Sequence, residues 1–225
     1  MSNLKEIRTR IASVESTKKM TAAMKLVSAA KLRRAQNRVF NFKLYANKLT
    51  NLLNNIASYN ELSGESPLFA VRKPVNVVLV VVTSNRGLCG AFNVNVIKEV
   101  HRIVHEEYKV KLLEEKFQLI CIGNKAVEEL QKNYKIRYRN DFLLEVPAFD
   151  EVAKMVSGLI SDFNEKKIDK VVVVYNHFVN PATQKVTVEP FLPVEKTKEK
   201  TVAKNADFIF EPSWELLVDE LIPKY

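Results

Sequence analysis

A glycine-containing loop at residues 83–93 is the part of this 225-residue chain best suited to chemistry. It follows an apolar run at 75–82 that is typical of a buried parallel strand, and it precedes a helical pattern. Phosphate-binding loops of doubly wound sheets lie at this position, at the N-terminus of a helix. However, Gly87 and Gly90 do not fit a dinucleotide or P-loop spacing, and no Lys-Ser or Lys-Thr pair follows them. The pattern therefore favours a tight structural turn, with Arg86, Gly87 and Gly90 at its centre, over a nucleotide site.

The second candidate for chemistry is the pair His101 and His105, which lies on one face of the predicted helix. Such pairs can bind zinc, but no third ligand is evident, and Arg102 rather than a glutamate follows His101. A solvated helix face is therefore favoured. No nucleophile with a neighbouring base and no pair of buried carboxylates is evident elsewhere. We expect a chain that is not itself a catalyst and that holds no cofactor or metal.

Strands and helices alternate around this loop. Apolar runs at 117–122 and 171–175 predict two more buried strands, and helical patterns lie at 97–108 and after Asp150, which is the expected N-cap. This order predicts an α/β fold with a mostly parallel, Rossmann-like sheet.

The predicted α/β domain spans residues 67–194, and residues 185–189 are expected to add an antiparallel edge strand. Residues 195–225 are expected to form a charged linker, a short strand at 208–211 and the start of a C-terminal helical segment.

The first 63 residues contain no glycine and no proline, which predicts one long helix, roughly 80 Å long at 1.5 Å per residue. Steps of three and four from Leu4 to Ile56 give sixteen positions, of which twelve are apolar. This seam predicts a coiled-coil segment at residues 1–63. A compact domain of some 160 residues is only about 35 Å across, so it could not cover such a rod.

The seam is interrupted at four consecutive positions, Lys18, Thr21, Lys25 and Ser28. There the apolar stripe shifts by one residue to Met20, Met24 and Val27. Two interpretations remain open: a contact zone in which methionine adapts to a partner that changes shape, or a plain register stutter.

The charge of the chain is concentrated in the predicted long helix. Residues 1–60 carry twelve Lys or Arg against two acids, whereas the whole chain has a net charge of +9. Such runs are often simple solvated faces. Here, however, only Glu15 is acidic between Val14 and Leu44, so pairs four residues apart cannot neutralise the run. The excess predicts an acidic surrounding, either phosphate or a ring of carboxylates.

No apolar run approaches the roughly 20 residues that a membrane-spanning helix needs. The basic N-terminus is similar to a transit peptide, but its heptads continue without a break, so this interpretation is rejected. Cys89 and Cys121 lack a CxxC partner and are predicted to be free thiols in a reducing compartment.

Three stretches of the sequence resemble the gamma subunit of the F-type ATP synthase, its central rotor stalk. They are residues 7–14 running into 17–36, residues 83–93, and residues 208–212. The resemblance implies that the long helix is part of an axle inside a ring of alpha and beta subunits. It implies axle contacts to the catalytic ring at Met20, Met24, Lys18, Lys25, Lys31, Arg33 and Arg34.

The resemblance also implies that the α/β domain is a foot that binds the epsilon subunit and the c-subunit ring through Phe208, Phe210 and Glu211. The family motif has tyrosines where this chain has the two phenylalanines. No nucleic acid is an expected partner. The implied location is peripheral, at the cytoplasmic face of the bacterial inner membrane. The family continues into a long C-terminal helix where this chain stops at Tyr225, so we expect a gamma subunit that lacks its C-terminal helix.

Two other classes of protein fit parts of the pattern. A DNA-binding leucine zipper would use residues 18–38 as its basic region, but the apolar seam upstream of it and the methionines within it argue against this class. A doubly wound small-molecule enzyme would place its ligand at residues 83–93, where the required motif is missing.

Overall fold

A computed structural model describes residues 3–59, 67–110, 114, 116–144 and 149–194. The chain divides into two compact units, the first of which ends at Leu53 and the second of which begins at Asn54. This division falls inside a helix, so the domain boundaries expected from the sequence stay predictions.

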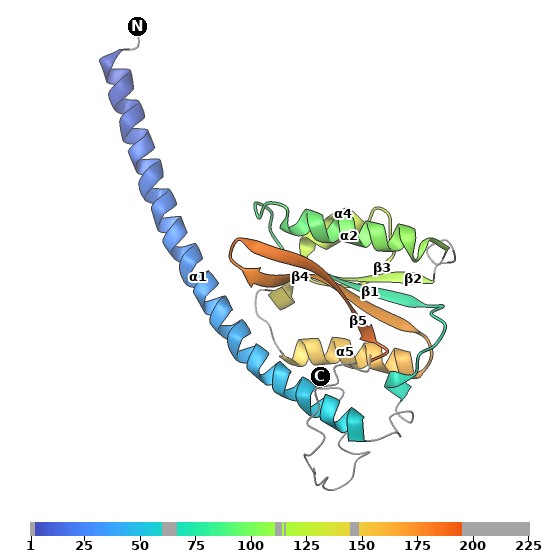
Figure 1. Cartoon of the computed structure of the whole chain (residues 1–225). Helices are drawn as coiled ribbons and strands as arrows, with labels where there is room; N and C mark the ends of the chain where they lie inside the picture. The colour runs from blue at the N-terminus through green and yellow to red at the C-terminus, as the bar shows by residue number, and fades with distance from the viewer. Residues whose placement is uncertain (1–2, 60–66, 111–113, 115, 145–148, 195–225) are drawn as a thin grey trace. The chain divides into compact units, whose positions relative to one another are not determined.

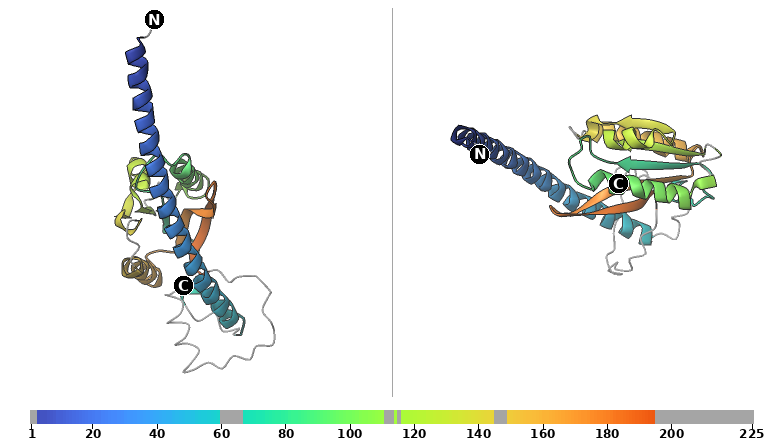
Figure 2. Two further views of the ribbon diagram at one scale, coloured as in Figure 1. Left: turned by 90° about the vertical axis from the view of Figure 1, so that its left-hand side faces the viewer. Right: turned by 90° about the horizontal axis from the view of Figure 1, so that it is seen from above.

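The first element is one continuous helix, α1 (Leu4–Tyr59), of 56 residues (Figure 1). Two further views show it unbroken along its length (Figure 2). At 1.5 Å per residue it is about 84 Å long. The long helix predicted from the absence of glycine and proline is therefore confirmed.

The second unit contains a five-stranded sheet with the strand order β3-β2-β1-β4-β5. β1 is parallel to both β2 and β4, β2 is parallel to β3, and β4 and β5 are antiparallel. The strands are β1 (Val77–Val82), β2 (Phe117–Ile122), β3 (Ile136–Asn140), β4 (Lys170–Asn180) and β5 (Thr183–Leu192). The predicted α/β class with a mostly parallel sheet is confirmed.

Helices cover both faces of this sheet (Figure 1). α2 (Phe92–Glu106) and α4 (Asn124–Leu130) lie on one face, and α5 (Phe149–Asn164) lies on the other. Short 3-10 turns, η1 (Pro67–Phe69) and η2 (Phe142–Leu144), precede β1 and follow β3. Because β1 sends one connection to β2 while its other neighbour is β4, the loop after β1 lies at the topological switch point of the sheet.

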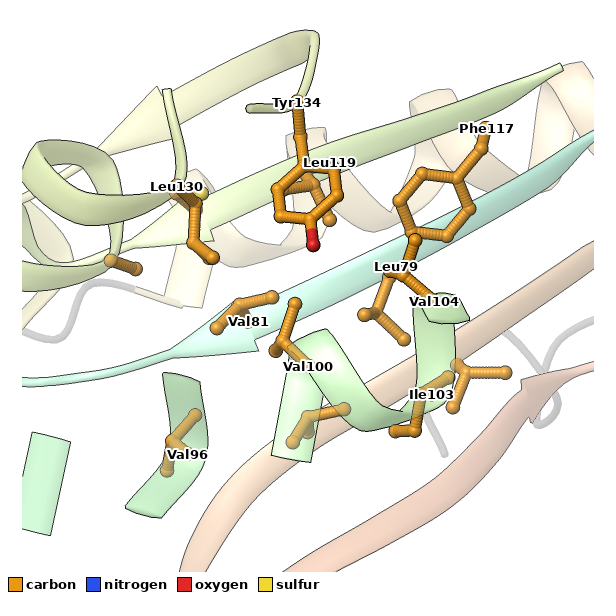
Figure 3. Close-up of a cluster of buried hydrophobic side chains, with 14 of the residues drawn as sticks. Leu79, Val81, Val96, Val100, Ile103, Val104, Phe117, Leu119, Leu130 and Tyr134 are labelled. Atoms are coloured by element: carbon orange, nitrogen blue, oxygen red, sulfur yellow. The ribbon is translucent and has the colours of Figure 1, made fainter. Parts of the chain in front are cut away.

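The main core lies between the sheet and α2 (Figure 3). Val96, Val100 and Ile103 of α2 pack toward β1 and β2, where Leu79 and Leu119 are fully buried. The apolar stripe of α2 arises from its spacing of three and four residues, and the sheet supplies alternate side chains from each strand. This core holds the start of α2, and with it the loop after β1, in place.

Some sequence expectations need correction. Asp150 is not the N-cap of α5, because that helix already begins at Phe149. β4 is longer than the predicted 171–175, and the predicted edge strand at 185–189 is confirmed within the longer β5. α4 and β3 were not predicted. The strand and helix expected after residue 195 lie outside the described residues. Among the described helices, none combines the length and the apolar character that crossing a membrane requires.

Candidate functional site: an exposed basic helix and a braced loop

The apolar seam of α1 is exposed to solvent from Leu4 to Phe42. From Asn3 to Lys48 every side chain except Gln36 and Ala46 is exposed. Leu4 is 66% exposed and Phe42 68%, although a leucine or phenylalanine normally gains about 1.5–3 kcal/mol from burial. Other large apolar side chains exposed along α1 are Ile7, Ile11, Val14, Leu32 and Val39. A solvated stripe of this length indicates a surface that partners cover.

The two methionines of the shifted stripe are exposed as well, Met20 to 60% and Met24 to 62%. They lie four residues apart and therefore share a face of α1. Unbranched methionine side chains adapt to surfaces that change shape. The geometry is consistent with the contact zone implied by the family resemblance.

Among the described residues, the basic side chains of α1 have almost no acidic partners. Between described side chains of α1, the one ion pair joins Lys19 to Glu15 at 3.2 Å. The other basic positions singled out from the sequence are all exposed: Lys18, Lys25, Lys31, Arg33 and Arg34. Their charge is therefore available to an acidic partner.

The loop after β1 is organised around the buried side chain of Asn93. Its Oδ1 accepts the backbone N–H of Ser84 at 2.9 Å, and its Nδ2 donates to Ser84 Oγ at 2.9 Å and to Cys89 Sγ at 3.2 Å. The Ser84 hydroxyl in turn donates to the carbonyl of Arg86 at 2.6 Å. The hydrogen bonds of the Asn93 amide to Ser84 and Cys89 thus determine the conformation of the loop.

The same loop is tied to the neighbouring elements of the sheet. Asn85 Nδ2 donates to the carbonyl of Asp141 at 2.8 Å, and Asn85 Oδ1 accepts the N–H of Asn124 at 3.2 Å. The Thr83 hydroxyl accepts the N–H of Ala126 at 2.9 Å. Because Asn124 and Ala126 lie in the first turn of α4, the loop provides the cap of that helix. The loop therefore has a structural role: it links the end of β1 to α4 and to the residue that follows β3.

The glycines of this region have different roles. Gly90 has a φ of +61°, which glycine adopts without steric cost, whereas a Cβ at Gly87 would meet open space. Leu88 also has a positive φ, and its side chain is fully exposed. Gly123, at the end of β2, was missed by the sequence reasoning. A Cβ there would lie 2.3 Å from the Thr83 carbonyl oxygen, so only glycine allows β2 and the loop to approach so closely.

His101 is half-buried rather than fully solvated, which corrects part of the sequence expectation. Its Nδ1 lies 2.6 Å from the hydroxyl of Tyr134, and burial raises the pKa of that phenol. The described residues contain no group of three or more His, Cys, Asp or Glu that could enclose a metal.

The two cysteines are free thiols in different environments. Burial raises the pKa of the Cys121 thiol to about 12, whereas Cys89 is exposed on the loop after β1. The foot residues Phe208, Phe210 and Glu211 lie outside the described residues.

A long helix with exposed apolar and basic side chains, together with an α/β domain, defines the class of a subunit that binds other proteins. The family model described as ATP synthase matches residues 3–225 of the chain. The ATP synthase gamma chain of Flavobacterium johnsoniae is 42% identical over 224 residues, which cover 100% of this chain and 77% of that protein. The gamma chain of Cytophaga hutchinsonii is 41% identical over 230 residues, with the same coverage of 100% and 77%.

Among solved structures, one chain from the central stalk and c ring of the Tetrahymena thermophila mitochondrial ATP synthase is 19% identical. The similarity covers 81% of this chain and 84% of that chain, with a TM-score of 0.49.

This chain belongs to the ATP synthase gamma family. The resemblance inferred from its motifs is confirmed. The chain is a non-catalytic rotor subunit of the F-type ATP synthase, and its partners are other subunits of that complex. The leucine-zipper and small-molecule enzyme alternatives are excluded by this membership.

Proposed function

We propose that α1 couples rotation to catalysis by presenting different surfaces to the three beta subunits of the enclosing ring. The observation that carries this proposal is the simultaneous exposure, along α1, of the apolar seam from Leu4 to Phe42 and of basic side chains that have no acidic partner in the described part of the chain. A sleeve of alpha and beta subunits would bury the first and neutralise the second.

The mechanism requires only that α1 contacts the open and closed states of a beta subunit differently. A beta subunit interconverts between open and closed states, and a partner shifts that equilibrium only by binding one state better than the other. As α1 turns, its methionine zone at Met20 and Met24 faces one beta subunit while Lys18 and Lys25, on the other side of the helix, face another. Each beta subunit is thereby driven in turn toward nucleotide binding, reaction and release.

We assign the ionic contacts of the axle to Lys18, Lys25, Lys31, Arg33 and Arg34. All five are exposed and have no acidic partner among the described residues. Acidic loops of the beta subunits are the partners that fit this charge.

The α/β domain is assigned to the foot, which contacts the epsilon subunit and the c ring. Phe208, Phe210 and Glu211 are proposed as its contact residues, and the turn with Arg86, Gly87 and Gly90 as a structural support. We propose domain boundaries at 1–63, 67–194 and 195–225. We also propose a peripheral location at the cytoplasmic face of the bacterial inner membrane, where proton flow through the c ring would turn the foot.

The assignment of the basic positions is tested by the double variant Arg33→Glu/Arg34→Glu in the assembled complex. Exposed ionic contacts contribute about 0.2–1 kcal/mol each, and their reversal adds repulsion, so proton-driven ATP synthesis should fall by about tenfold or more. The matched control, Arg33→Lys/Arg34→Lys, keeps the charge and should retain most of the rate. Normal assembly and normal synthesis by the reversed variant would refute the acidic-sleeve assignment.

A further inference from the structure

We propose that Arg72 and Asp169 are positioning residues for rotation: they anchor the segment at residues 67–76, so that torque turns the α/β domain instead of twisting this segment. The inference deepens the rotor role of the chain and rests on it. The segment lies between α1 and β1 in the sequence, so it carries any force that passes along the backbone between these two elements. Each residue has two soft backbone dihedrals, so the segment resists twisting only where contacts fix it.

Arg72 attaches the middle of this segment to the end of α5. Its Nη1 donates to the carbonyl of Phe163 at 3.0 Å, and its guanidinium lies 4.5 Å from the centre of the Phe163 ring. A cation beside the last carbonyl groups of a helix is also favoured by the helix dipole. Phe163 is fully buried, so Arg72 makes two different contacts to a residue that is held in the core.

Asp169 attaches the end of the segment to the start of β4. Its carboxylate is buried, and Oδ2 accepts the backbone N–H groups of Val75 at 3.1 Å and of Asn76 at 2.9 Å. In return, the carbonyl of Asn76 accepts the N–H groups of Asp169 at 2.9 Å and of Lys170 at 3.3 Å. Hydrogen bonds to a carboxylate are roughly twice as strong as those between neutral groups. Bonds in both directions therefore hold the residues before β1 against the start of β4.

The start of the segment is held as well, and burial contributes little between these points. The N–H of Val194 donates to the carbonyl of Leu68 at 2.9 Å, the side chain of Leu68 is buried, and η1 contacts α5. In contrast, Val71 is 85% exposed, and Lys73 and Val75 are exposed too. Beyond Leu68, the polar contacts of Arg72 and Asp169 are therefore what fixes this segment to the domain.

The test measures the torsional stiffness of the assembled complex with a probe on the exposed Cys89 of the α/β domain. With the alpha and beta subunits immobilised and no ATP present, the angular variance of the probe reports how far the domain twists relative to the ring. Arg72→Ala should raise this variance by about twofold or more, because the hydrogen bond and the ring contact are both lost. Arg72→Lys keeps a cation and a donor and should restore part of the stiffness. Lys73→Ala removes an exposed neighbour and should change nothing.

A second control separates anchoring from stability of the domain. Leu130→Ala leaves a cavity in the core beside α4, so it should lower the melting temperature of the domain without changing the variance. Asp169→Asn keeps the shape but accepts weaker hydrogen bonds, so it should also raise the variance, and it decides the test if Arg72→Ala does not assemble. The proposal is overturned if the deciding variant leaves the variance unchanged, or if Lys73→Ala or Leu130→Ala raises it equally.

The rotor role is tested separately from this anchor. ATP-driven rotation of the same probe in the unmodified complex tests the role of the chain as a rotor, whereas the variance is measured without rotation. A lack of rotation would therefore count against the rotor role, and with it the anchor that rests on this role. An unchanged variance in Arg72→Ala, in a complex that rotates, would overturn the anchor alone.

Discussion

At the scale of single residues, Gly123 determines whether the loop after β1 fits against β2. Its φ is +103°, and an added Cβ would lie 2.3 Å from the Thr83 carbonyl oxygen. Gly123→Ala should therefore lower the free energy of unfolding by about 2–4 kcal/mol, through backbone strain and displacement of the loop. Urea denaturation followed by circular dichroism measures this change.

Gly87→Ala is the control for this substitution. A Cβ at Gly87 meets nothing within 4 Å, so the variant should change stability by no more than about 0.5 kcal/mol. Equal effects of the two substitutions would show that the close approach at Gly123 is not what stabilises the loop.

Cys121 makes stability depend on pH in the alkaline range. Burial raises the pKa of its thiol from 9.0 to about 12, so between these values the unfolded chain loses a proton that the folded chain keeps. Stability must then fall as pH rises, by about 1.4 kcal/mol between pH 8 and pH 10. Urea denaturation of the unmodified chain and of Cys121→Ala should show this extra loss only in the former. Parallel pH profiles would contradict the assigned cause.

The sequence revealed residues that act locally and missed those that act through distant contacts. The lack of a nucleotide motif at Gly87 and Gly90 was visible from their spacing. In contrast, Gly123 is separated from Thr83 in the sequence, and only the packing of β2 beside β1 brings them together. Similarly, the half-buried state of His101 depends on Tyr134, which no helical periodicity connects to it.

At the scale of elements, the long helix α1 is destabilised by repulsion between its own basic side chains. Because the basic residues of α1 have one acidic partner among the described side chains, they repel one another. A peptide of residues 3–59 should gain helicity as salt is raised from about 10 mM to 0.5 M, where the screening length falls from about 30 Å to a few ångströms. Far-UV circular dichroism at several peptide concentrations separates this effect from self-association of the apolar seam.

A matched peptide with Lys18, Lys25 and Lys31 replaced by glutamine should gain less helicity from salt. If both peptides respond equally, charge repulsion is not the source of the effect.

Elements that the composition or periodicity of the sequence marks clearly were predictable, and short surface elements were not. α1 was evident from the absence of glycine and proline, β1 from an uninterrupted apolar run, and β2 from a run in which only Gln118 is polar. β3 has an exposed centre, and α4 has only 7 residues, so neither carries a clear period. Both are defined by tertiary contacts, since β3 pairs with β2 and α4 is capped by the loop after β1.

At the scale of the whole molecule, the distribution of charge explains why the chain works inside an assembly. The first 60 residues carry twelve basic side chains against two acids, and the remainder of a chain with net charge +9 is nearly neutral. The acidic sleeve proposed for the first part would attract it strongly and would attract the nearly neutral remainder much less. The proposal that α1 is an axle is therefore supported by the difference in net charge between the first 60 residues and the remainder of the chain.

The role of this chain as a rotor subunit is tested by observing its rotation within the complex. Cys89 is exposed and Cys121 is buried, so a thiol-reactive probe attaches to the loop after β1. With the complex immobilised through its alpha and beta subunits, ATP should drive continuous rotation of a probe on Cys89 in one direction, in steps that match the three catalytic sites. If the complex hydrolyses ATP while the probe shows no net rotation, the rotor role of this chain is contradicted.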